Sequence, residues 1–330
     1  MDSTGEIRVQ PALRLQGVEK SFGAQRAVSA LDLAVPKGET CGLIGPSGAG
    51  KTTSIRLIMS ILFPDSGQVE VLGRASALEA KDRVGYLPEE RGVYRKMKVG
   101  AFLKYLAGLK GTPESAALSR ARELLSQLGL DDILQKKCED LSKGMLQRVQ
   151  FVGSILHKPE LLILDEPFSG LDPVSVRMLK SVVADERRRG TTILFSTHVM
   201  AQAEELCDRV VMIHKGRKVL DESMSTLRRR YDPTRVLFEP LDADADLSVL
   251  RDVPGVLSLQ RSEGDVQLRL AAGTDPASVI REVAARVTPA RIEIARIRLE
   301  DVFVDFVRGE GGESEVALRQ HLQGLAGEKA

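Results

Sequence analysis

Cysteine is scarce in this sequence, and tryptophan is absent. The three cysteines, Cys41, Cys138 and Cys207, are odd in number, far apart and outside any C-x-x-C pair. They therefore indicate neither a disulfide framework nor a cysteine zinc site, and we expect them to be reduced thiols in the cytosol.

Long apolar stretches are also missing. No run approaches the roughly 18 apolar residues that a transmembrane helix needs, and residues 1–10 are polar, without the apolar core of a signal peptide. We therefore expect a soluble protein, which would serve a membrane process only by docking to a membrane partner.

Neither sign of charge dominates. The chain has 47 basic and 46 acidic side chains, for a net charge of +1. A nucleic-acid-binding protein would favour a basic stripe, so we expect no nucleic-acid partner. The 330 residues, with an ordinary hydrophobic fraction of 43%, suffice for one large domain or two.

A glycine-rich loop is the most informative feature present. Residues 45–52 match the pattern G-x-x-x-x-G-K-[ST], between an apolar stretch expected as a strand (40–44) and a stretch of helical spacing (53–61). The backbone N–H groups of such a loop and the helix N-terminus make an anion site. We expect Lys51 to reach the β- and γ-phosphates of a nucleotide and the Thr52 hydroxyl to hold Mg²⁺. The predicted nucleotide contacts here are Gly45, Pro46, Ser47, Gly48, Ala49, Gly50, Lys51, Thr52 and Thr53.

Further polar residues follow other expected strands. Asp165 comes directly after an apolar run typical of a strand buried on both faces, where nucleotide hydrolases place a carboxylate that organises Mg²⁺. Glu166 is placed to take a proton from attacking water. His198 could contact the γ-phosphate, although a single histidine is normally structural. Phe22, at a turn ahead of the loop, is either a stacking platform for adenine or an ordinary buried aromatic.

The order of elements predicts two domains. Strands and helices alternate around the glycine loop, which favours an α/β domain with a mostly parallel core. We expect Arg187–Arg189 to form a solvated last helical turn. The predicted organisation is a leader (1–10), an α/β domain (11–231) with a helical subdomain at about 92–158, a small α+β domain (232–308), and a flexible or helical tail (309–330).

The predicted second domain has the order βαββαβ. It shows no catalytic constellation, so packing or dimerisation is its expected role. Its expected strands are 235–238, 256–261, 266–270 and 291–297, and its expected helices are 246–251, 276–287 and 299–307.

Taken together, these motifs resemble those of the ATP-binding cassette (ABC) ATPases over about residues 13–230. In the terms of that family, residues 45–52 are the Walker A loop and 161–166 the Walker B strand with its glutamate. Residues 169–172 are the D-loop, and 141–145, Leu-Ser-Lys-Gly-Met, match the signature that usually reads Leu-Ser-Gly-Gly-Gln. Two single residues complete the match: His198 at the switch position and Phe22 at the aromatic A-loop position.

The resemblance implies a mechanism. In that family two cassettes clasp two ATP molecules head to tail, each between the Walker A loop of one subunit and the signature of the other, so this chain should act as a homodimer. ATP and Mg²⁺ are the implied cofactors. The implied catalytic residues are Glu166, His198 and Lys51; the implied metal ligands are Thr52, Asp165 and Glu89; and the further nucleotide contacts are Ser142, Lys143, Gly144 and Asp172.

The sequence departs from the family pattern at three positions. Glu89 replaces the Q-loop glutamine; it can still bind Mg²⁺ but adds repulsion near Asp165 and Glu166. Lys143 either adds positive charge near the γ-phosphate held by the partner or is merely solvated, and Met145 replaces the last signature residue.

Three features resemble cassettes of two-component sodium or drug exporters: the run Tyr-Leu-Pro-Glu-Glu-Arg-Gly at 86–92, the signature with Lys143, and the added second domain, of the DUF4162 type. The membrane partners of those cassettes are separate permeases of the ABC-2 type. We expect a cytoplasmic ATPase, peripheral on the inner face of the membrane, that drives such a permease.

The alternative is a soluble ABC-type ATPase that is not coupled to transport. A P-loop kinase or GTPase is disfavoured, because those classes lack the signature and a GTPase would need Asn-Lys-x-Asp, which is missing.

Overall fold

The computed structural model describes residues 10–90, 92–230, 235–262, 265–271, 273–294, 298–300 and 302–304. They form two compact units that divide between Ser223 and Met224, and each unit is described by itself. Residues 1–9 of the predicted leader and all of the predicted tail lie outside the described residues.

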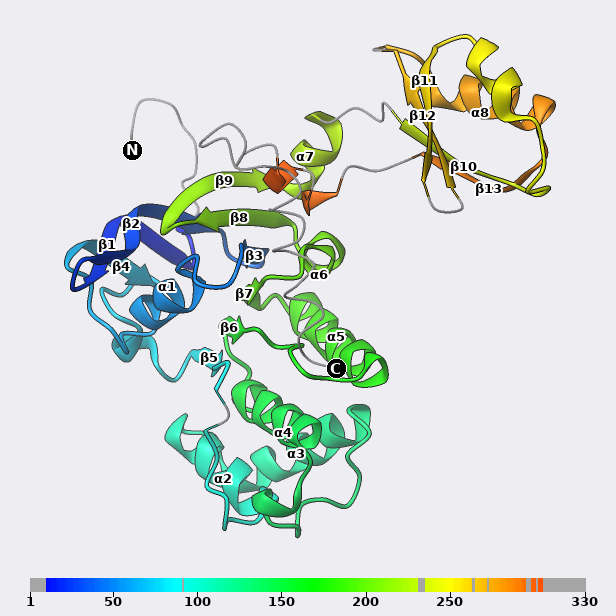
Figure 1. Cartoon of the computed structure of the whole chain (residues 1–330). Helices are drawn as coiled ribbons and strands as arrows, with labels where there is room; N and C mark the ends of the chain where they lie inside the picture. Colours follow the sequence, from blue (N-terminus) through cyan, green and yellow to red (C-terminus); the bar gives the residue numbers. More distant parts are fainter. Residues whose placement is uncertain are drawn as a thin grey trace. The chain divides into compact units, whose positions relative to one another are not determined.

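The first unit contains two sheets and several helices (Figure 1). Its strands are β1 (Leu13–Phe22), β2 (Gln25–Val35), β3 (Thr40–Ile44), β4 (Ser66–Val71), β5 (Val84–Leu87), β6 (Leu161–Asp165), β7 (Thr192–Thr197), β8 (Arg209–His214) and β9 (Arg217–Ser223). Its helices are α1 (Lys51–Ile58), α2 (Val99–Leu109), α3 (Glu114–Gln127), α4 (Lys143–Ile155), α5 (Pro173–Arg188) and α6 (Met200–Leu206), with 3-10 turns η1 (Ala77–Ala80) and η2 (Cys138–Asp140).

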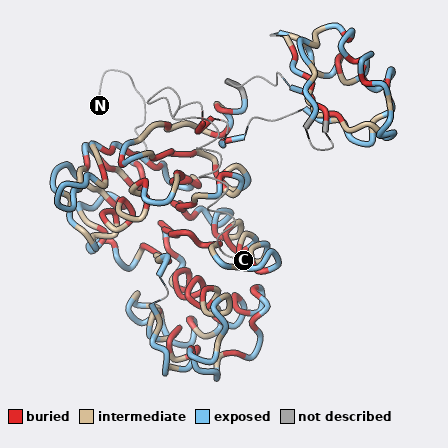
Figure 2. The backbone as a smooth tube through the Cα atoms, viewed as in Figure 1, coloured by how far each residue is buried: buried red, intermediate tan, exposed pale blue. Residues whose placement is uncertain are grey.

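The six-stranded central sheet positions the candidate site. Its order is β5-β6-β7-β3-β8-β9, and every neighbouring pair except β8–β9 is parallel. Residues of β3, β6 and β7 are buried throughout, as the red tube in Figure 2 shows. Because these three strands are neighbours and parallel, the segments that follow them meet at one edge of the sheet. The predicted α/β fold with a mostly parallel core is confirmed.

A second, antiparallel sheet of order β2-β1-β4 completes the nucleotide-binding half. Its apolar face shares a core with α1 and the central sheet, where Leu15, Leu31, Ile55 and Leu43 pack in one cluster. The Cα register of β1 shifts near Val18, on the way to the turn at Phe22.

The helical subdomain contains α2, α3 and α4 (Figure 1). The buried side chains of Phe102, Leu125 and Phe151 belong to its interior. Arg120 on α3 forms an ion pair of 2.6 Å with Glu186 on α5, which ties the subdomain to the α/β body.

The three arginines Arg187–Arg189 are exposed, as predicted for a solvated last turn, but their ion-pair partners were not predicted. Arg189 contacts the buried Glu186 at 2.6 Å and donates to the Pro159 carbonyl at 2.7 Å. Arg187 forms an ion pair with Asp208. Arg188 is the most exposed of the three and forms an ion pair with Asp185 on its own helix. The three-residue pattern hid the acidic partners, which lie on other segments or one turn earlier.

The second unit contains a four-stranded sheet of order β11-β12-β10-β13 with all pairs antiparallel. Its elements are α7 (Met224–Arg230), β10 (Arg235–Pro240), η3 (Leu247–Asp252), β11 (Val256–Ser262), β12 (Asp265–Leu270), α8 (Pro276–Arg286) and β13 (Pro289–Ile294). Phe238, Leu268 and Val283 belong to its core. The predicted order βαββαβ is found from β10 to β13, with the first helix reduced to a 3-10 turn. Residues 299–300 and 302–304 are helical, while 305–307 lie outside the described residues.

Candidate functional site

The glycine loop connects β3 to α1, as predicted. Gly45, Gly48 and Gly50 have φ angles of 150°, 78° and 110°, in the region that side chains disfavour. A Cβ at Gly45 would lie 2.2 Å from the Ile213 carbonyl oxygen, and one at Gly50 would lie 2.4 Å from that of Ala27. A Cβ at Gly48 would meet nothing within 4 Å. The loop is therefore pressed against β2 and β8 at its two ends and open at its middle.

Lys51 lies buried at the first position of α1. Its Nζ donates to the carbonyl oxygens of Gly45 at 2.8 Å and Pro46 at 3.1 Å, and it lies 3.9 Å from a carboxylate oxygen of Glu166. Burial lowers the pKa of Lys51, and the charge of Glu166 opposes that shift. The ammonium group is thus held over the loop, facing the end of β6.

Asp165 ends β6 with one carboxylate oxygen occupied and the other free. Oδ1 accepts hydrogen bonds from Ser196 Oγ at 2.5 Å and Thr52 Oγ1 at 3.3 Å. Oδ2 is buried and has no hydrogen-bond partner among the described residues. Burial raises the pKa of Asp165, and the Ser196 hydrogen bond opposes it. A buried oxygen without a partner, beside a hydroxyl, fits a hard cation such as Mg²⁺.

The described residues hold no cluster of three or more His, Cys, Asp or Glu side chains that could chelate a metal alone. A magnesium ion at Asp165 would therefore need oxygens from a bound phosphate or water as well.

Glu166 and His198 form a hydrogen-bonded pair at the ends of β6 and β7. Glu166 Oε1 lies 2.9 Å from His198 Nδ1, and this hydrogen bond raises the pKa of His198. The Glu166 backbone has φ 49°, and its N–H donates to Ser196 Oγ at 3.1 Å. A carboxylate held by a histidine in this way is oriented to accept a proton from water.

Glu89 lies two residues beyond β5, with its side chain exposed. Its charge contributes, after the larger effect of burial, to the raised pKa of Asp165. Glu89 thus acts electrostatically on the Asp165 carboxylate, while its role as a metal ligand stays a prediction. The neighbouring Glu90 forms an ion pair of 3.2 Å with Arg56 on α1.

Phe22 ends β1 with 50% of its surface exposed, so the alternative of an ordinary buried aromatic is wrong. The Lys20 ammonium lies 5.8 Å from the centroid of the ring. An exposed aromatic face ahead of the glycine loop is what a stacking platform requires.

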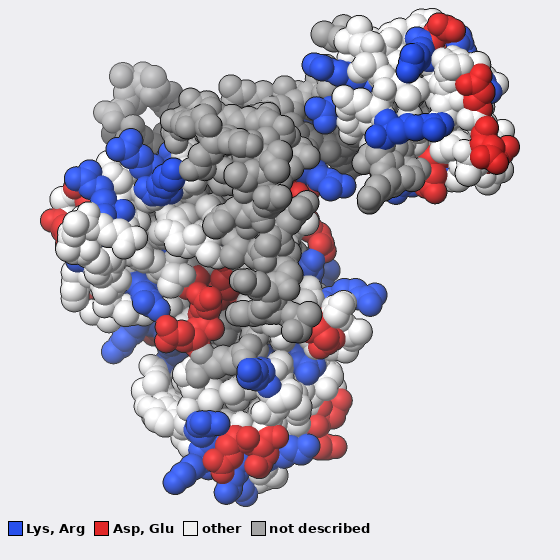
Figure 3. All heavy atoms as spheres, in the orientation of Figure 1, with Lys and Arg blue, Asp and Glu red and all other residues white. Residues whose placement is uncertain are grey.

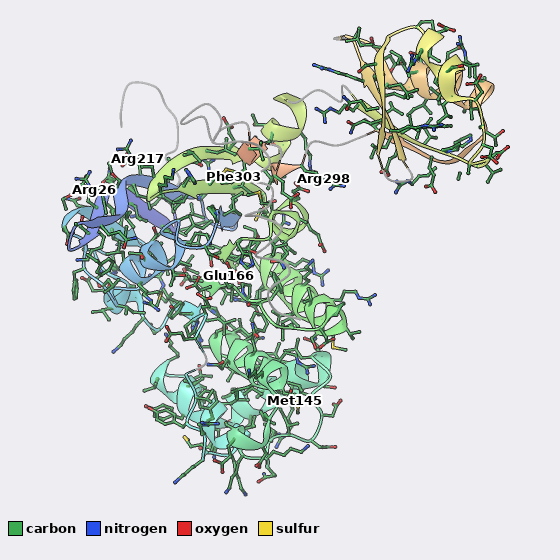
Figure 4. All side chains as sticks on the ribbon, viewed as in Figure 1. Arg26, Met145, Glu166, Arg217, Arg298 and Phe303 are labelled. Atoms are coloured by element: carbon green, nitrogen blue, oxygen red, sulfur yellow. The ribbon has the colours of Figure 1, made fainter. Side chains whose placement is uncertain are left out.

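The predicted signature and D-loop contacts begin two helices. Ser142 caps α4, accepting from Met145 N at 3.2 Å, and the side chain of Lys143 is exposed. Asp172 caps α5, accepting from the N–H groups of Val174 and Ser175 at 3.0 Å each. Hydrogen bonds with Ser175 lower the pKa of Asp172. Figure 4 shows Met145 at α4 in the helical subdomain and Glu166 at the edge of the central sheet.

No hydrogen bond or ion pair in the described part of the chain joins Ser142, Lys143, Gly144 or Asp172 to the glycine loop. The structure therefore brings together Lys51, Thr52, Asp165, Glu166 and His198 and leaves the signature residues apart from them.

Sequence reasoning missed Ser196 and Gln147. Ser196, on β7, hydrogen-bonds both the Asp165 carboxylate and the Glu166 N–H. Gln147, on α4, donates to the Pro167 carbonyl at 2.7 Å. A hydroxyl two residues before His198 was a usable signal for the first, but nothing in the local sequence marks the partner of the second.

A glycine loop with a buried lysine, a strand-end aspartate followed by glutamate, and a histidine on the neighbouring strand define a P-loop nucleotide hydrolase. Comparison with known families narrows this class. The ABC transporter family model matches residues 28–169. The model of the C-terminal domain of DrrA1-3-like ATP-binding proteins matches residues 223–307.

Relatives cover almost the whole chain. An uncharacterized ABC transporter ATP-binding protein, YhaQ of Bacillus subtilis (strain 168), is 38% identical over 295 residues, which are 89% of this chain and 98% of that protein. The bacitracin transport ATP-binding protein BcrA of Enterococcus faecalis is 29% identical over 91% of this chain and 97% of its own.

A solved structure gives the same assignment. An ATP-binding subunit of an ABC transporter aligns with a TM-score of 0.62 at 31% identity, over 67% of this chain and 93% of that one. The chain belongs to the ATP-binding proteins of ABC transporters, and it is an ATPase with the C-terminal domain of the DrrA1-3-like type. No helix in the described residues has the length and apolar character needed to span a membrane.

Proposed function

We propose that this chain is the ATP-hydrolysing subunit of an exporter, in which ATP binding joins two copies and drives a separate membrane permease. The observation that carries the hydrolytic part of the proposal is the group of side chains at the ends of β6 and β7. Glu166 lies 2.9 Å from His198 and 3.9 Å from Lys51, next to the buried free oxygen of Asp165.

The roles of these residues follow from their geometry. We infer that Glu166 orients the attacking water and accepts its proton, and that His198 holds Glu166 in place and reaches the γ-phosphate. Lys51 exchanges the loop carbonyls for phosphate oxygens. Asp165 Oδ2, the Thr52 hydroxyl and, by the same proposal, Glu89 would hold Mg²⁺, which would neutralise charge on the phosphates.

The proposed homodimer is supported by the part of the site that one chain leaves uncovered. The glycine loop surrounds a triphosphate from one side only, and the signature residues lie elsewhere on the same chain. A second copy can bring Ser142, Lys143 and Gly144 to the open side, with Asp172 nearby, so that the N-terminus of α4 faces the γ-phosphate.

The proposed permease and its side of the membrane rest on relatives and on one surface. BcrA is a bacitracin transport protein, and LnrL of Bacillus subtilis, 28% identical over 88% of this chain, is a linearmycin resistance protein. On the helical subdomain Tyr94 and Tyr105, 55% and 43% exposed, pack edge to face at 5.5 Å. An exposed aromatic pair suits a partner surface, which we assign to a permease of the ABC-2 type at the cytoplasmic face.

Glu166→Gln tests the catalytic and dimer proposals together. The variant should bind ATP with Mg²⁺, lose at least a hundredfold in hydrolysis rate, and elute as a dimer in size-exclusion chromatography with ATP. The matched control is Glu160→Gln at the opposite end of β6, where the carboxylate pairs only with Arg83 on the surface. Normal turnover by Glu166→Gln would remove Glu166 as the base, and a monomer with bound ATP would remove the homodimer.

The permease proposal needs its own experiment. The ATP-trapped variant should retain a polytopic membrane protein when it is purified from detergent-solubilised membranes, and Tyr94→Ser should weaken that recovery without changing basal hydrolysis. Recovery of ribosomes or of soluble complexes instead would favour the alternative, a soluble ABC-type ATPase.

A further inference from the structure

The start of helix α4 contacts the segment that follows the catalytic glutamate, at two places. Gln147 lies one turn into α4 and is 7% exposed; its Nε2 donates to the Pro167 carbonyl at 2.7 Å. Gly144 lies so close to the D-loop that a Cβ there would be 3.4 Å from Leu171 Cδ2. The signature residues 141–145 and the start of α4, called the signature turn below, are therefore in contact with residues 167–171 of the same chain.

The same segment fixes the position of Glu166. Pro167 follows Glu166 directly, and the proline ring fixes its φ, so a displacement of the Pro167 carbonyl is passed to the preceding residue. Glu166 also has little freedom of its own, because its backbone is in the left-handed region and its N–H is held by Ser196. Ser169 N donates to the Glu166 carbonyl at 3.2 Å, which closes a tight turn.

We propose that Gln147 is a positioning residue that couples the signature turn of a chain to the catalytic glutamate of the same chain. This inference rests on the proposed function. When the signature turn contacts ATP held by the partner, the shift of α4 is passed through Gln147 and Pro167 to Glu166. Glu166 of each chain is then aligned only when the signature turn of that chain has also bound the ATP held by the partner.

Gln147→Met tests this link, because methionine fills a similar volume and cannot donate to Pro167. We expect kcat to fall roughly tenfold to a hundredfold, which is the usual cost of misplacing a catalytic group by about 1 Å. The Kd for ATP should stay within twofold, because the hydrogen bond that the substitution removes goes to Pro167 and not to the glycine loop. The dependence of rate on ATP concentration should lose its cooperativity, with the Hill coefficient falling to 1. Gln147→Leu also removes the donor and stays apolar, so it should give the same result.

The matched control is the same change three residues further along the helix. Gln150 has the same 7% exposure, but its side chain donates to the Gly92 carbonyl at 3.3 Å, which lies outside residues 166–172. Gln150→Met should lower Tm by a similar amount and change kcat by less than threefold.

Two results would overturn the inference. The first is a kcat within twofold of wild type in both Gln147 variants. The second is a loss of kcat that is always matched by a lower Tm and weaker ATP binding, because a purely structural role in packing would cause all three. The double variant Gln147→Met, Glu166→Gln separates this from the homodimer proposal. The double variant should still form the ATP-trapped dimer. If the single variant Glu166→Gln stays monomeric with ATP, the homodimer is refuted, and the kcat of the Gln147 variants then tests the positioning role separately.

Discussion

Ser196→Ala should reduce activity most at low pH and reduce stability most at high pH. The Ser196 hydroxyl donates to Asp165 Oδ1 and accepts from the Glu166 N–H, so one side chain contacts the Asp165 carboxylate and the Glu166 backbone. The hydrogen bond to Asp165 opposes the effect of burial, which raises the pKa of that carboxyl. Without the hydroxyl the pKa of Asp165 rises further.

The size of the effect follows from the type of bond removed. A hydrogen bond to a charged group contributes about 1.5–3 kcal/mol, and one to a neutral group about 0.5–1.5 kcal/mol. The ionised form of Asp165 therefore loses more than the protonated form. An equilibrium changes tenfold for each 1.4 kcal/mol, so the ionised, Mg²⁺-binding form becomes roughly tenfold less favoured.

The two observables have opposite signs. Magnesium binding needs ionised Asp165, so hydrolysis by the variant at subsaturating Mg²⁺ should be most impaired at low pH and recover toward pH 8.5. A carboxyl whose pKa is raised by folding destabilises the fold progressively as pH rises from its unfolded-state pKa to its folded-state pKa, and a higher folded-state pKa extends that loss to higher pH. The loss of Tm relative to wild type should therefore be larger at pH 8.5 than at pH 5.5.

Steady-state hydrolysis with Mg²⁺ titrations and thermal unfolding, both from pH 5.5 to 8.5, measure these quantities. Ser154→Ala is the matched control, because it removes a buried hydroxyl that donates only within α4, to the Phe151 carbonyl. A constant ratio of variant to wild-type activity over the whole pH range would refute the reasoning. So would Ser196→Thr behaving like Ser196→Ala, since threonine keeps the hydroxyl.

Two further substitutions follow from the glycine loop and the aromatic residue. Gly50→Ala should lower Tm by several degrees and abolish ATP binding, because its Cβ would clash with the Ala27 carbonyl at 2.4 Å. Gly48→Ala has only the cost of its backbone angle, about 1–3 kcal/mol, so it should lose less stability. Equal losses of stability in the two variants, measured by calorimetry, would contradict the clash at Gly50. Phe22→Ala should weaken ATP binding roughly fivefold or more, because stacking contributes about 1–3 kcal/mol. Binding of inorganic triphosphate, which has no base, should stay unchanged. Equal weakening of both ligands would show that Phe22 does not stack on adenine.

The individual motifs could be predicted from the sequence because each is local. The glycine loop, the strand ending at Asp165 and the helix cap at Ser142 are all specified by residues within a few positions of one another. The pairing of Glu166 with His198 needed more, namely the knowledge that β6 and β7 are neighbours. The sequence places both residues at strand ends but does not predict that they pair.

The parts that could not be predicted are the contacts between distant segments. Arg189 is exposed, as expected, but three consecutive arginines at a helix end carry no sign of a partner. The buried Glu186, one turn earlier, pairs with Arg189 and also with Arg120 from α3. The Gln147 hydrogen bond to Pro167 was hidden for the same reason. A glutamine on a helix is ordinarily a surface residue, and its burial depends on packing between subdomains.

The charges around the glycine loop explain why Mg²⁺ and ATP should bind together. Asp165 and Glu166 lie at the strand ends, and Glu89 adds a third negative charge that is felt at Asp165, while Lys51 is the cation that contacts this group. A triphosphate alone would bring about four more negative charges beside these carboxylates at a few ångströms, where the repulsion is weakly screened. A divalent cation between Asp165 Oδ2 and the phosphates reverses the sign of that interaction. We therefore predict that Glu89, which resembles the family's Q-loop glutamine in position but carries a charge, makes nucleotide binding by this chain depend more strictly on the metal.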